Sequence, residues 1–281
     1  MKKLAMRQWE TIASLKDNPH GTARSAAREF RQVTGIGKID VTVVFGSGWD
    51  PAVKQLGKSI IEFPVTRLPG FLPPTVKGHA GKVRVVRIGK KHVLVFRGRK
   101  HNYEFRDGDG MEAVVHYVRV ARTLGCRTFI HTNAVGGLRP GLKVGQAVLI
   151  RDHNDIISRV PSPLQGTTKF LECSRVYSAR LRTLCKEIDP SLAEGIIAQV
   201  GGPHFETQSV ADFLRRNGID VVGMSMIQEA IIAHAMMMAF LGISLVTDPA
   251  GEKITHAQVT AVVNRRAPRL GRLIRRLIER M

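Results

Sequence analysis

Val41-Thr-Val-Val-Phe-Gly-Ser-Gly48 is a short apolar, β-branched run that leads directly into a glycine turn. Such side chains favour strands, and glycines mark the turns that end them. Similar runs recur along the chain at 83–88, 92–96, 128–132, 146–150, 196–200, 220–222 and 243–247. Helical patterns occur at 22–35, 110–124, 175–188, 207–217 and 226–241. Alternating strands and helices predict an α/β fold with a central mixed, largely parallel β-sheet flanked by helices.

The domain organisation is simple. The 281 residues contain no shift in composition, no Ser/Gly linker and no internal repeat, so we expect one domain over residues 1–281. Within it, a helical segment at 1–36 precedes the first strand, and a basic helix at 264–281 closes the chain. The hydrophobic content of 43% is sufficient for a substantial core.

Cysteine usage and hydropathy indicate the compartment. Cys126, Cys173 and Cys185 are an odd number without CxxC spacing, which argues against a disulfide framework or a zinc site. The N-terminus lacks the apolar core of a signal peptide, and no apolar run reaches the roughly 20 residues that span a bilayer. We expect a cytoplasmic protein that does not enter membranes.

The net charge of +20 is unusually high and favours anionic partners. Basic residues are spread along the chain, and the densest run is 264–281, with seven arginines opposite an apolar helical face. Two interpretations stay open for this run: a terminal helix with a solvated basic face, or a surface that binds nucleic acid through nonspecific electrostatic attraction.

Two segments carry the chemistry of a flat ring next to an anion. Gly201-Gly-Pro-His-Phe-Glu-Thr207 combines the aromatic plane of Phe205 with the carboxylate of Glu206, and Gly223-Met-Ser225 offers a hydroxyl next to a backbone turn. An aromatic face beside a carboxylate suits a nitrogen-rich ring whose N–H groups need an acceptor. The pair therefore predicts a site that holds a purine beside a phosphate.

Other segments favour anion binding more weakly. Arg99 and His101 follow an apolar strand, and the planar guanidinium matches a phosphate. Ser47 lies in a glycine loop that is either an oxyanion cradle or a plain strand–helix turn. His79 between small residues and Asn133 before two glycines are each compatible with a structural role or a ligand contact.

These segments share a predicted position in the sheet. Residues 46–48, 131–134, 201–206, 223–225 and 247–248 each lie where a strand is expected to finish. Because ligands of open α/β sheets bind outside the carboxyl ends of the strands, we expect the five segments to meet in one site.

In order and spacing, the chain resembles the trimeric purine nucleoside phosphorylases over nearly its whole length, and bacterial members most closely. The matching segments are 43–49, 68–75, 78–81, 99–104, 132–138, 144–153, 202–207 and 222–225. The resemblance implies that a purine nucleoside and inorganic phosphate give the free base and ribose 1-phosphate. It also implies a homotrimer, with phosphate as a co-substrate and neither a metal nor an organic cofactor.

The resemblance also implies residue roles. The phosphate site would be formed by Ser47, His79, Arg99, His101, the backbone at Ala134 and Ser225. The nucleoside would be held by Tyr103, Asn133, Phe205, Glu206, Met224, Asp248 and His256, and by Phe170 from the neighbouring subunit. His101, Glu206 and Asp248 would act in catalysis, by placing phosphate and stabilising charge on the departing base.

The sequence departs from the family pattern at several positions. Family members that act on 6-oxopurines carry asparagine where this chain has Asp248, and an ionised carboxylate accepts hydrogen bonds but donates none. Asp248 therefore favours a 6-amino group or must be protonated to serve a 6-oxopurine, so both substrate classes stay open. Lys100 and Phe105 replace an apolar residue and a glycine, and a shortened loop between Asp248 and His256 leaves the alignment of His256 open.

Overall fold

The computed structural model describes residues 2–76, 78–105, 110–156, 158, 160–164, 167–168 and 170–281, with the backbone alone for residues 2–7. The helices are α1 (Lys2–Asp17), α2 (Pro19–Thr34), α3 (Asp50–Val53), α4 (Met111–Thr123), α5 (Ala179–Ile188), α6 (Gln208–Arg216), α7 (Ile227–Ala235) and α8 (His256–Arg280), with short 3-10 turns η1 (Lys54–Leu56), η2 (Val65–Arg67) and η3 (Asn102–Glu104). The strands are β1 (Val41–Phe45), β2 (Ser59–Pro64), β3 (Lys82–Ile88), β4 (Lys91–Arg97), β5 (Thr128–Gly137), β6 (Ala147–Asn154), β7 (Ala193–Gln199), β8 (Val221–Gly223) and β9 (Ala239–Pro249).

The described strands form one mixed sheet in the order β2-β3-β4-β1-β5-β8-β7-β6-β9. β9 also pairs with β5, so the last five strands close into a ring. β4, β1, β5 and β9 run parallel, as do β6, β7 and β8, and antiparallel pairings join these two groups and add β2 and β3. The sheet is thus the predicted mixed sheet, with more antiparallel pairing than the sequence pattern indicated.

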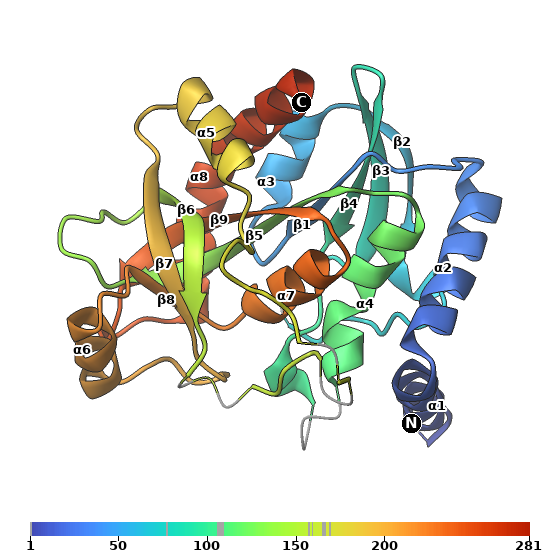
Figure 1. The fold of residues 1–281 in the computed structure, drawn as a ribbon, viewed down its shortest axis with the longest axis horizontal. Coiled ribbons are helices and arrows are strands. Elements are labelled where there is room, and N and C mark those ends of the chain that lie inside the picture. Colours follow the sequence, from blue (N-terminus) through green and yellow to red (C-terminus); the bar gives the residue numbers. More distant parts are fainter. Residues whose placement is uncertain are drawn as a thin grey trace.

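Helices cover both faces of the sheet (Figure 1), with α3, α5 and α8 on one side and α2, α4 and α7 on the other. Alternate residues of β1 divide between the two cores because successive side chains of a strand point to opposite faces. Val44 packs with α2 and α4, whereas Val43 and Phe45 pack with α3 and α8. This three-layer arrangement confirms the predicted α/β class and holds the strand ends rigidly.

Most predicted elements are present, with shifted ends. All eight predicted strands occur, and β2 was missed. The predicted helix at 226–241 is wrong at its end: α7 stops at Ala235, Met237 adopts a left-handed backbone (φ 57°), and Ala239 already begins β9. The last helix starts at His256 and not at 264, because Thr255 caps it by accepting a hydrogen bond from Gln258 N.

Candidate active site

The predicted site segments converge on one cavity of about 300 Å³. Every predicted site residue except Phe170 lines it: Ser47, His79, Arg99, His101, Tyr103, Asn133, Ala134, Phe205, Glu206, Met224, Ser225, Asp248 and His256. Phe170 lies outside the cavity with a fully exposed side chain. His256 lines the wall despite the short loop before it, as the first residue of α8.

The route by which these segments meet differs from the prediction in two respects. Residues 131–134 lie inside β5, which continues to Gly137, and not at its end. β8 runs antiparallel to β5, with Gly136 paired to Val222, so residues 223–225 approach the middle of the site from the opposite direction. Parallel strands β1, β4 and β9 thus bring residues 46–48, 99–101 and 247–248 to the site at their carboxyl ends, as predicted. The ring of five strands adds residues 201–206 and 223–225.

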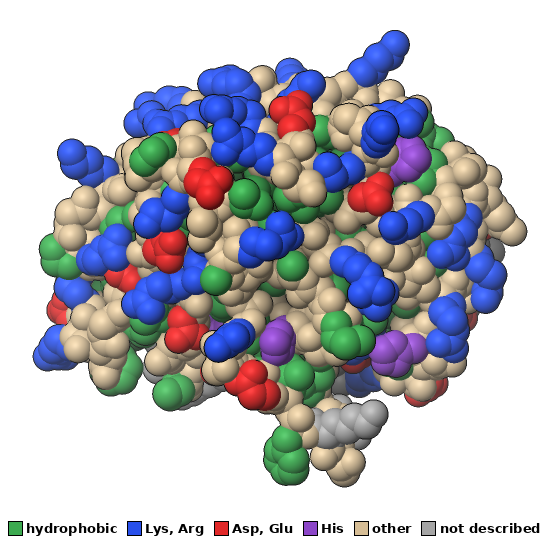
Figure 2. All heavy atoms as spheres, turned by 45° about the horizontal axis from the view of Figure 1, so that its top comes forward, with side chains coloured by type: hydrophobic (Ala, Val, Ile, Leu, Met, Phe, Trp, Pro, Cys, Tyr) green, Lys and Arg blue, Asp and Glu red, His purple; other side chains and the backbone are tan. Residues whose placement is uncertain are grey.

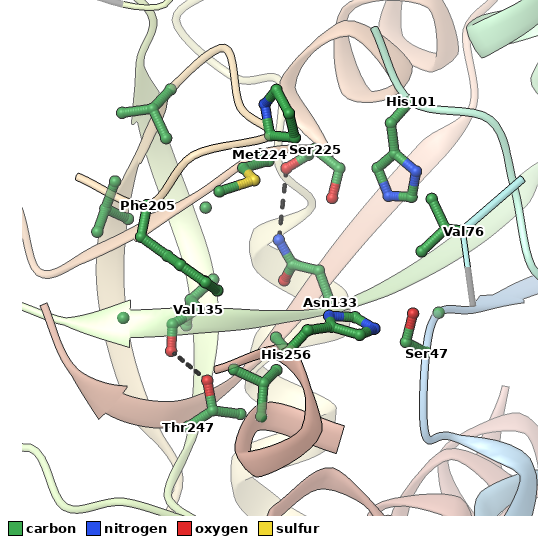
Figure 3. Close-up of a pocket in the computed structure, with 18 of the residues that line it drawn as sticks. Ser47, Val76, His101, Asn133, Val135, Phe205, Met224, Ser225, Thr247 and His256 are labelled. Carbon is green, nitrogen blue, oxygen red and sulfur yellow. Dashed lines mark hydrogen bonds between the residues drawn. The ribbon is translucent and has the colours of Figure 1, made fainter. Parts of the chain in front are cut away.

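The cavity has two chemically distinct ends (Figure 3). Ser47 and His101 lie toward one end, Phe205 and Thr247 toward the other, and Asn133 lies between them. The amide of Asn133 is fixed in this central position, because Ser244 Oγ donates to its Oδ1 at 2.7 Å and its Nδ2 donates to the Ser225 carbonyl at 3.4 Å.

Arg99 supplies a buried cation at the first end. Its Nη2 donates to Ser225 Oγ at 2.6 Å, and its side chain is only 3% exposed. Nε and Nη1 are buried and have no hydrogen-bond partner among the described residues. A Cβ atom at position 46 would lie 3.0 Å from Nη1, so Gly46 is what allows the guanidinium to lie against the backbone. A buried guanidinium with unused donors is a strong anion site.

His101 lies beside this cation in a neutral form. Burial and the Arg99 charge lower the pKa of His101. The hydrogen bond with Glu104 raises it, but by less. Burial opposes ionisation of Glu104, but hydrogen bonds from His101, Lys100 and Thr75 outweigh it and hold the pKa of Glu104 well below its ordinary value. An ionised carboxylate only accepts, so His101 Nδ1 donates to Glu104 Oε1 (3.2 Å). The other ring nitrogen of His101 is then left as an acceptor.

The imidazole of His79 is also neutral. Burial and then the Arg99 charge lower the pKa of His79 to about 3. Its ring stacks on His101 with centroids 5.3 Å apart, and His101 stacks on Tyr103 at 5.0 Å. Three aromatic rings therefore form one wall of the cavity next to the cation.

Lys100 and Phe105, which both depart from the family pattern, lie next to each other. Lys100 Nζ donates to Glu104 Oε2 at 2.8 Å and lies 5.6 Å from the centre of the Phe105 ring. The ammonium group is thus held by a carboxylate and an aromatic face behind the site, and does not add a charge to the cavity.

The second end combines an aromatic face with two carboxylates. Phe205 and Glu206 reach it on the loop after β7, where Gly202 has a φ of 67° and a Cβ would lie 2.7 Å from Tyr103. Burial, with the charges of Glu206 and Glu252, raises the pKa of Asp248 to about 6, although a hydrogen bond from Thr247 lowers it.

Burial raises the pKa of Glu206 as well. Hydrogen bonds with the backbone of Glu206 and Gly251 lower it, but by less. Because burial and mutual repulsion oppose a second charge, the pair of Glu206 and Asp248 retains one proton more readily than two separate carboxylates would.

Three buried residues around the site were not among the predicted ones. Glu104 stands three residues after His101, a spacing that could have indicated their contact. Thr247 Oγ1 donates to Asp248 Oδ1 at 2.7 Å. Glu229 is an acidic residue in an otherwise mostly apolar helix, and that contrast was the available signal.

No group of three or more His, Cys, Asp or Glu side chains in the described ranges is arranged to hold a metal ion. None of the helices in that part of the chain combines the length and the hydrophobicity needed to cross a bilayer.

Comparison with known proteins agrees with this geometry. Residues 40–279 match the model of the phosphorylase superfamily, which defines the class of the protein. The purine nucleoside phosphorylases of Mycobacterium tuberculosis and Mycobacterium bovis are each 46% identical over 273 residues, covering 96% of this chain and 100% of theirs. The chain therefore belongs to the purine nucleoside phosphorylases, enzymes that transfer a pentosyl group from a purine nucleoside to phosphate.

Solved structures give the same answer at lower identity. The Schistosoma mansoni purine nucleoside phosphorylase in complex with inosine is 28% identical, has a TM-score of 0.83, and is matched over 93% of this chain and 96% of its own. The same protein in complex with adenosine also gives a TM-score of 0.83 at 28% identity, over 92% and 96% of the chains. The family resemblance found in the sequence is thus confirmed for the fold as well as for the activity.

Proposed function

We propose that this phosphorylase acts on 6-oxopurine nucleosides such as inosine and guanosine, using Asp248 in its protonated form. The observation that carries the proposal is the pair of carboxyls at the aromatic end of the cavity, buried Asp248 and half-buried Glu206, both with a raised pKa. A 6-oxopurine presents an N–H at position 1 and acceptors at N7 and the 6-oxygen. Glu206 as the carboxylate accepts from the N–H, and Asp248 as the acid donates to the acceptors.

A 6-aminopurine requires the proton on the other carboxyl. Its N1 is an acceptor, which needs a protonated Glu206, and its amino group donates to an ionised Asp248. The enzyme would therefore act on the alternative substrates, adenosine and methylthioadenosine, if Glu206 is the residue that keeps the shared proton. The pKa of Asp248 is raised to about 6, and this favours the 6-oxopurine assignment.

The proposal assigns phosphate to the opposite end of the cavity. The Arg99 guanidinium supplies positive charge there, and Ser47, Ser225, His79 and the backbone at Ala134 complete the set. The acceptor nitrogen of neutral His101 suits the proton of a hydrogen phosphate. No metal or organic cofactor takes part in this proposal.

The sugar would lie between the two ends, beside Asn133, Tyr103, Met224 and His256. A phosphate oxygen forms a bond to the anomeric carbon while the bond from that carbon to N9 breaks. The electron pair leaves on the purine, where the hydrogen bond from Asp248 stabilises it, and a solvent proton completes the free base. Holding phosphate and nucleoside in line supplies much of the acceleration.

A panel of substrates tests the proposal. Inosine, guanosine, adenosine and methylthioadenosine are incubated with the protein, with and without phosphate, between pH 5.5 and 8.5. We expect phosphate-dependent release of hypoxanthine and guanine together with ribose 1-phosphate. Preference for adenosine at every pH would establish the alternative substrate class, whereas release without phosphate would indicate a hydrolase.

A homotrimer in the cytoplasm is also part of the proposal. Phe170 is fully exposed and lies outside the cavity of its own chain, as a residue that covers the sugar of a neighbouring subunit would. Such an arrangement leaves each site incomplete until subunits associate. Sedimentation equilibrium measures the assembly directly.

A second candidate function is nonspecific binding of nucleic acid by the exposed face of α8. Its seven arginines are all exposed, and those without an acidic partner among the described residues are Arg265, Arg266, Arg272 and Arg276. Figure 2 shows basic side chains spread over this side of the molecule, with fewer acidic ones between them. The apolar face of α8 is buried in the core, so the helix has no exposed apolar anchor for a membrane.

Binding to single-stranded RNA at several salt concentrations tests this second function. Four phosphate contacts give a slope of log affinity against log salt on the order of −3, and replacing three of the arginines by glutamine removes about 2 from it. A slope that the replacements leave unchanged would exclude this face of α8 as the binding surface.

A further inference from the structure

We propose that Glu229 is a positioning residue of the phosphate site, which fixes both the Arg99 guanidinium and the turn that carries Ser225. The inference rests on the proposed phosphate-binding role of Arg99 and Ser225. It concerns a residue that lies behind the cavity and does not line it.

Both oxygens of this carboxylate are engaged. Glu229 is 1% exposed, and its Oε1 accepts from the Tyr117 hydroxyl at 2.9 Å and lies 3.3 Å from His131 Nε2 and 3.8 Å from Arg99 Nε. Its Oε2 accepts from the backbone N–H of Met226 at 3.0 Å. One carboxylate thus connects β5, α4, the loop after β4 and the start of α7.

The contact with Met226 bears on Ser225. Met226 has a φ of 105°, a region that residues other than glycine rarely adopt, and such a backbone persists only where its surroundings fix it. Glu229 holds the N–H of this residue, which directly follows Ser225. The position of Ser225 Oγ, 2.6 Å from Arg99 Nη2, therefore depends on the same carboxylate.

The contact with Arg99 concerns charge. A buried guanidinium needs a counter-ion, because an uncompensated charge in the interior is costly. Burial opposes ionisation of Glu229, but the hydrogen bond from His131 and the charge of Arg99 outweigh it and lower the pKa of Glu229 to about 2. The carboxylate therefore stays ionised and balances the charge of Arg99 from a position that does not line the cavity.

Steady-state kinetics with either substrate varied tests the assignment. Glu229→Gln keeps the shape of the side chain and removes its charge. We expect the KM for phosphate to rise about tenfold, the effect of losing one charge-assisted contact, with the KM for inosine within about twofold of wild type. Glu229→Ala is expected to raise the phosphate KM further.

Gln228→Ala is the matched control. Gln228 is the neighbouring residue of α7, is 2% exposed, and accepts a hydrogen bond from Gln199 Nε2 at 2.6 Å, away from Arg99. Its removal should lower the melting temperature in the same way, because a buried hydrogen bond is lost. The phosphate KM of this variant should stay at the wild-type value.

Four outcomes would overturn the inference. An unchanged phosphate KM in Glu229→Gln removes the positioning role, and a lower one means that the carboxylate acts only as an opposing charge. Equal rises in both KM values, matched by Gln228→Ala, indicate general structural damage. If neither Glu229 variant folds, Tyr117→Phe removes one donor to Oε1 and should raise the phosphate KM about twofold, and no rise overturns the inference.

The failure of this inference is distinguishable from failure of the proposed function. Wild-type protein that releases bases without phosphate contradicts the proposed function, whatever the variants do. If the wild-type protein and Glu229→Gln both saturate with phosphate at the same KM, only the positioning role of Glu229 is contradicted.

Discussion

Replacing Asp248 by asparagine should remove the pH dependence of inosine cleavage. The side chain of Asp248 is buried at the aromatic end of the cavity, and its pKa is raised from 3.8 to about 6. Only the protonated acid donates a hydrogen bond to a 6-oxopurine, whereas an asparagine amide donates at every pH. The variant therefore replaces a donor that depends on pH by a permanent one.

The magnitude follows from the protonated fraction. The parameter kcat/KM reports ionisations of the free enzyme, and with a pKa of about 6 the donor form falls from about one half at pH 6 to about 1% at pH 8. We expect wild-type kcat/KM for inosine to fall roughly 50-fold over this interval, and Asp248→Asn to stay flat. At pH 8 the variant should exceed wild type by up to about 100-fold, or about 2.7 kcal/mol.

Thr247→Val provides a matched comparison. The Thr247 hydroxyl lies 2.7 Å from Asp248 Oδ1 and lowers the pKa of that carboxyl. Its removal should raise the pKa of Asp248 and move the fall in kcat/KM to higher pH. The assay is inosine cleavage between pH 5.5 and 8.5, with adenosine in parallel. Identical pH profiles for wild type and Asp248→Asn would refute the reasoning.

Stability offers an independent measurement of the same group. Because the pKa of Asp248 is higher in the folded state, this residue favours folding most below about pH 4, and that contribution is lost as the pH rises through 6. The shift of about two units corresponds to about 3 kcal/mol. Denaturant unfolding should show Asp248→Asn to be more stable than wild type by up to this amount at pH 7, with the difference absent near pH 3.

Three further predictions concern single side chains. Glu206→Ala should lose most of its nucleoside cleavage with a native circular dichroism spectrum, because the acceptor for the base is gone, and near-normal turnover would contradict that role. Phe170→Ala should be defective alone and partly rescued when co-assembled with Glu206→Ala, because mixed trimers contain sites with both residues intact, and absence of rescue argues against a shared site. Phe30→Ala, at a fully buried position, should lower the free energy of unfolding by about 3–5 kcal/mol while activity per folded molecule is kept.

The sequence predicted the strands in which every side chain is buried. The strands at 41–45 and 128–132 are buried on both faces, so they appear as continuous β-branched runs. β2 was missed because it lies at the edge of the sheet, where Ile60 is exposed, and carries Glu62 and Pro64 among its six residues. An edge strand has no continuous apolar run to find.

The end of α7 shows a different limit of the sequence. Residues 236–241 continue the apolar, methionine-rich composition of the helix, so nothing local marks its end. The helix stops because β9 must start at Ala239 to pair with β5 at Thr128. A tertiary pairing thus overrides the helical propensity of the segment.

In the active site, the residue types were predictable and their ionisation was not. Arg99 and Glu206 were found from local patterns, because each stands in a short segment of unusual composition. The role of Glu229 depends on Tyr117 and His131, which are 112 and 98 residues away in the chain. The raised pKa of Asp248 likewise comes from burial and neighbours that only the folded chain assembles.

The distribution of charge along the cavity has a consequence for how substrates enter. Arg99 makes one end favourable to a dianion, while Glu206 and Asp248 make the other end unfavourable to it, so we expect phosphate to bind at the Arg99 end. In the proposed orientation the departing purine would carry negative charge at the carboxylate end, and two ionised carboxyls would oppose its release from the sugar. One retained proton on Asp248 lowers that repulsion, because only Glu206 then stays charged. In the proposed binding mode, the proton that recognises the 6-oxo group is the same proton that stabilises the leaving base, so base selection and turnover should change together with pH.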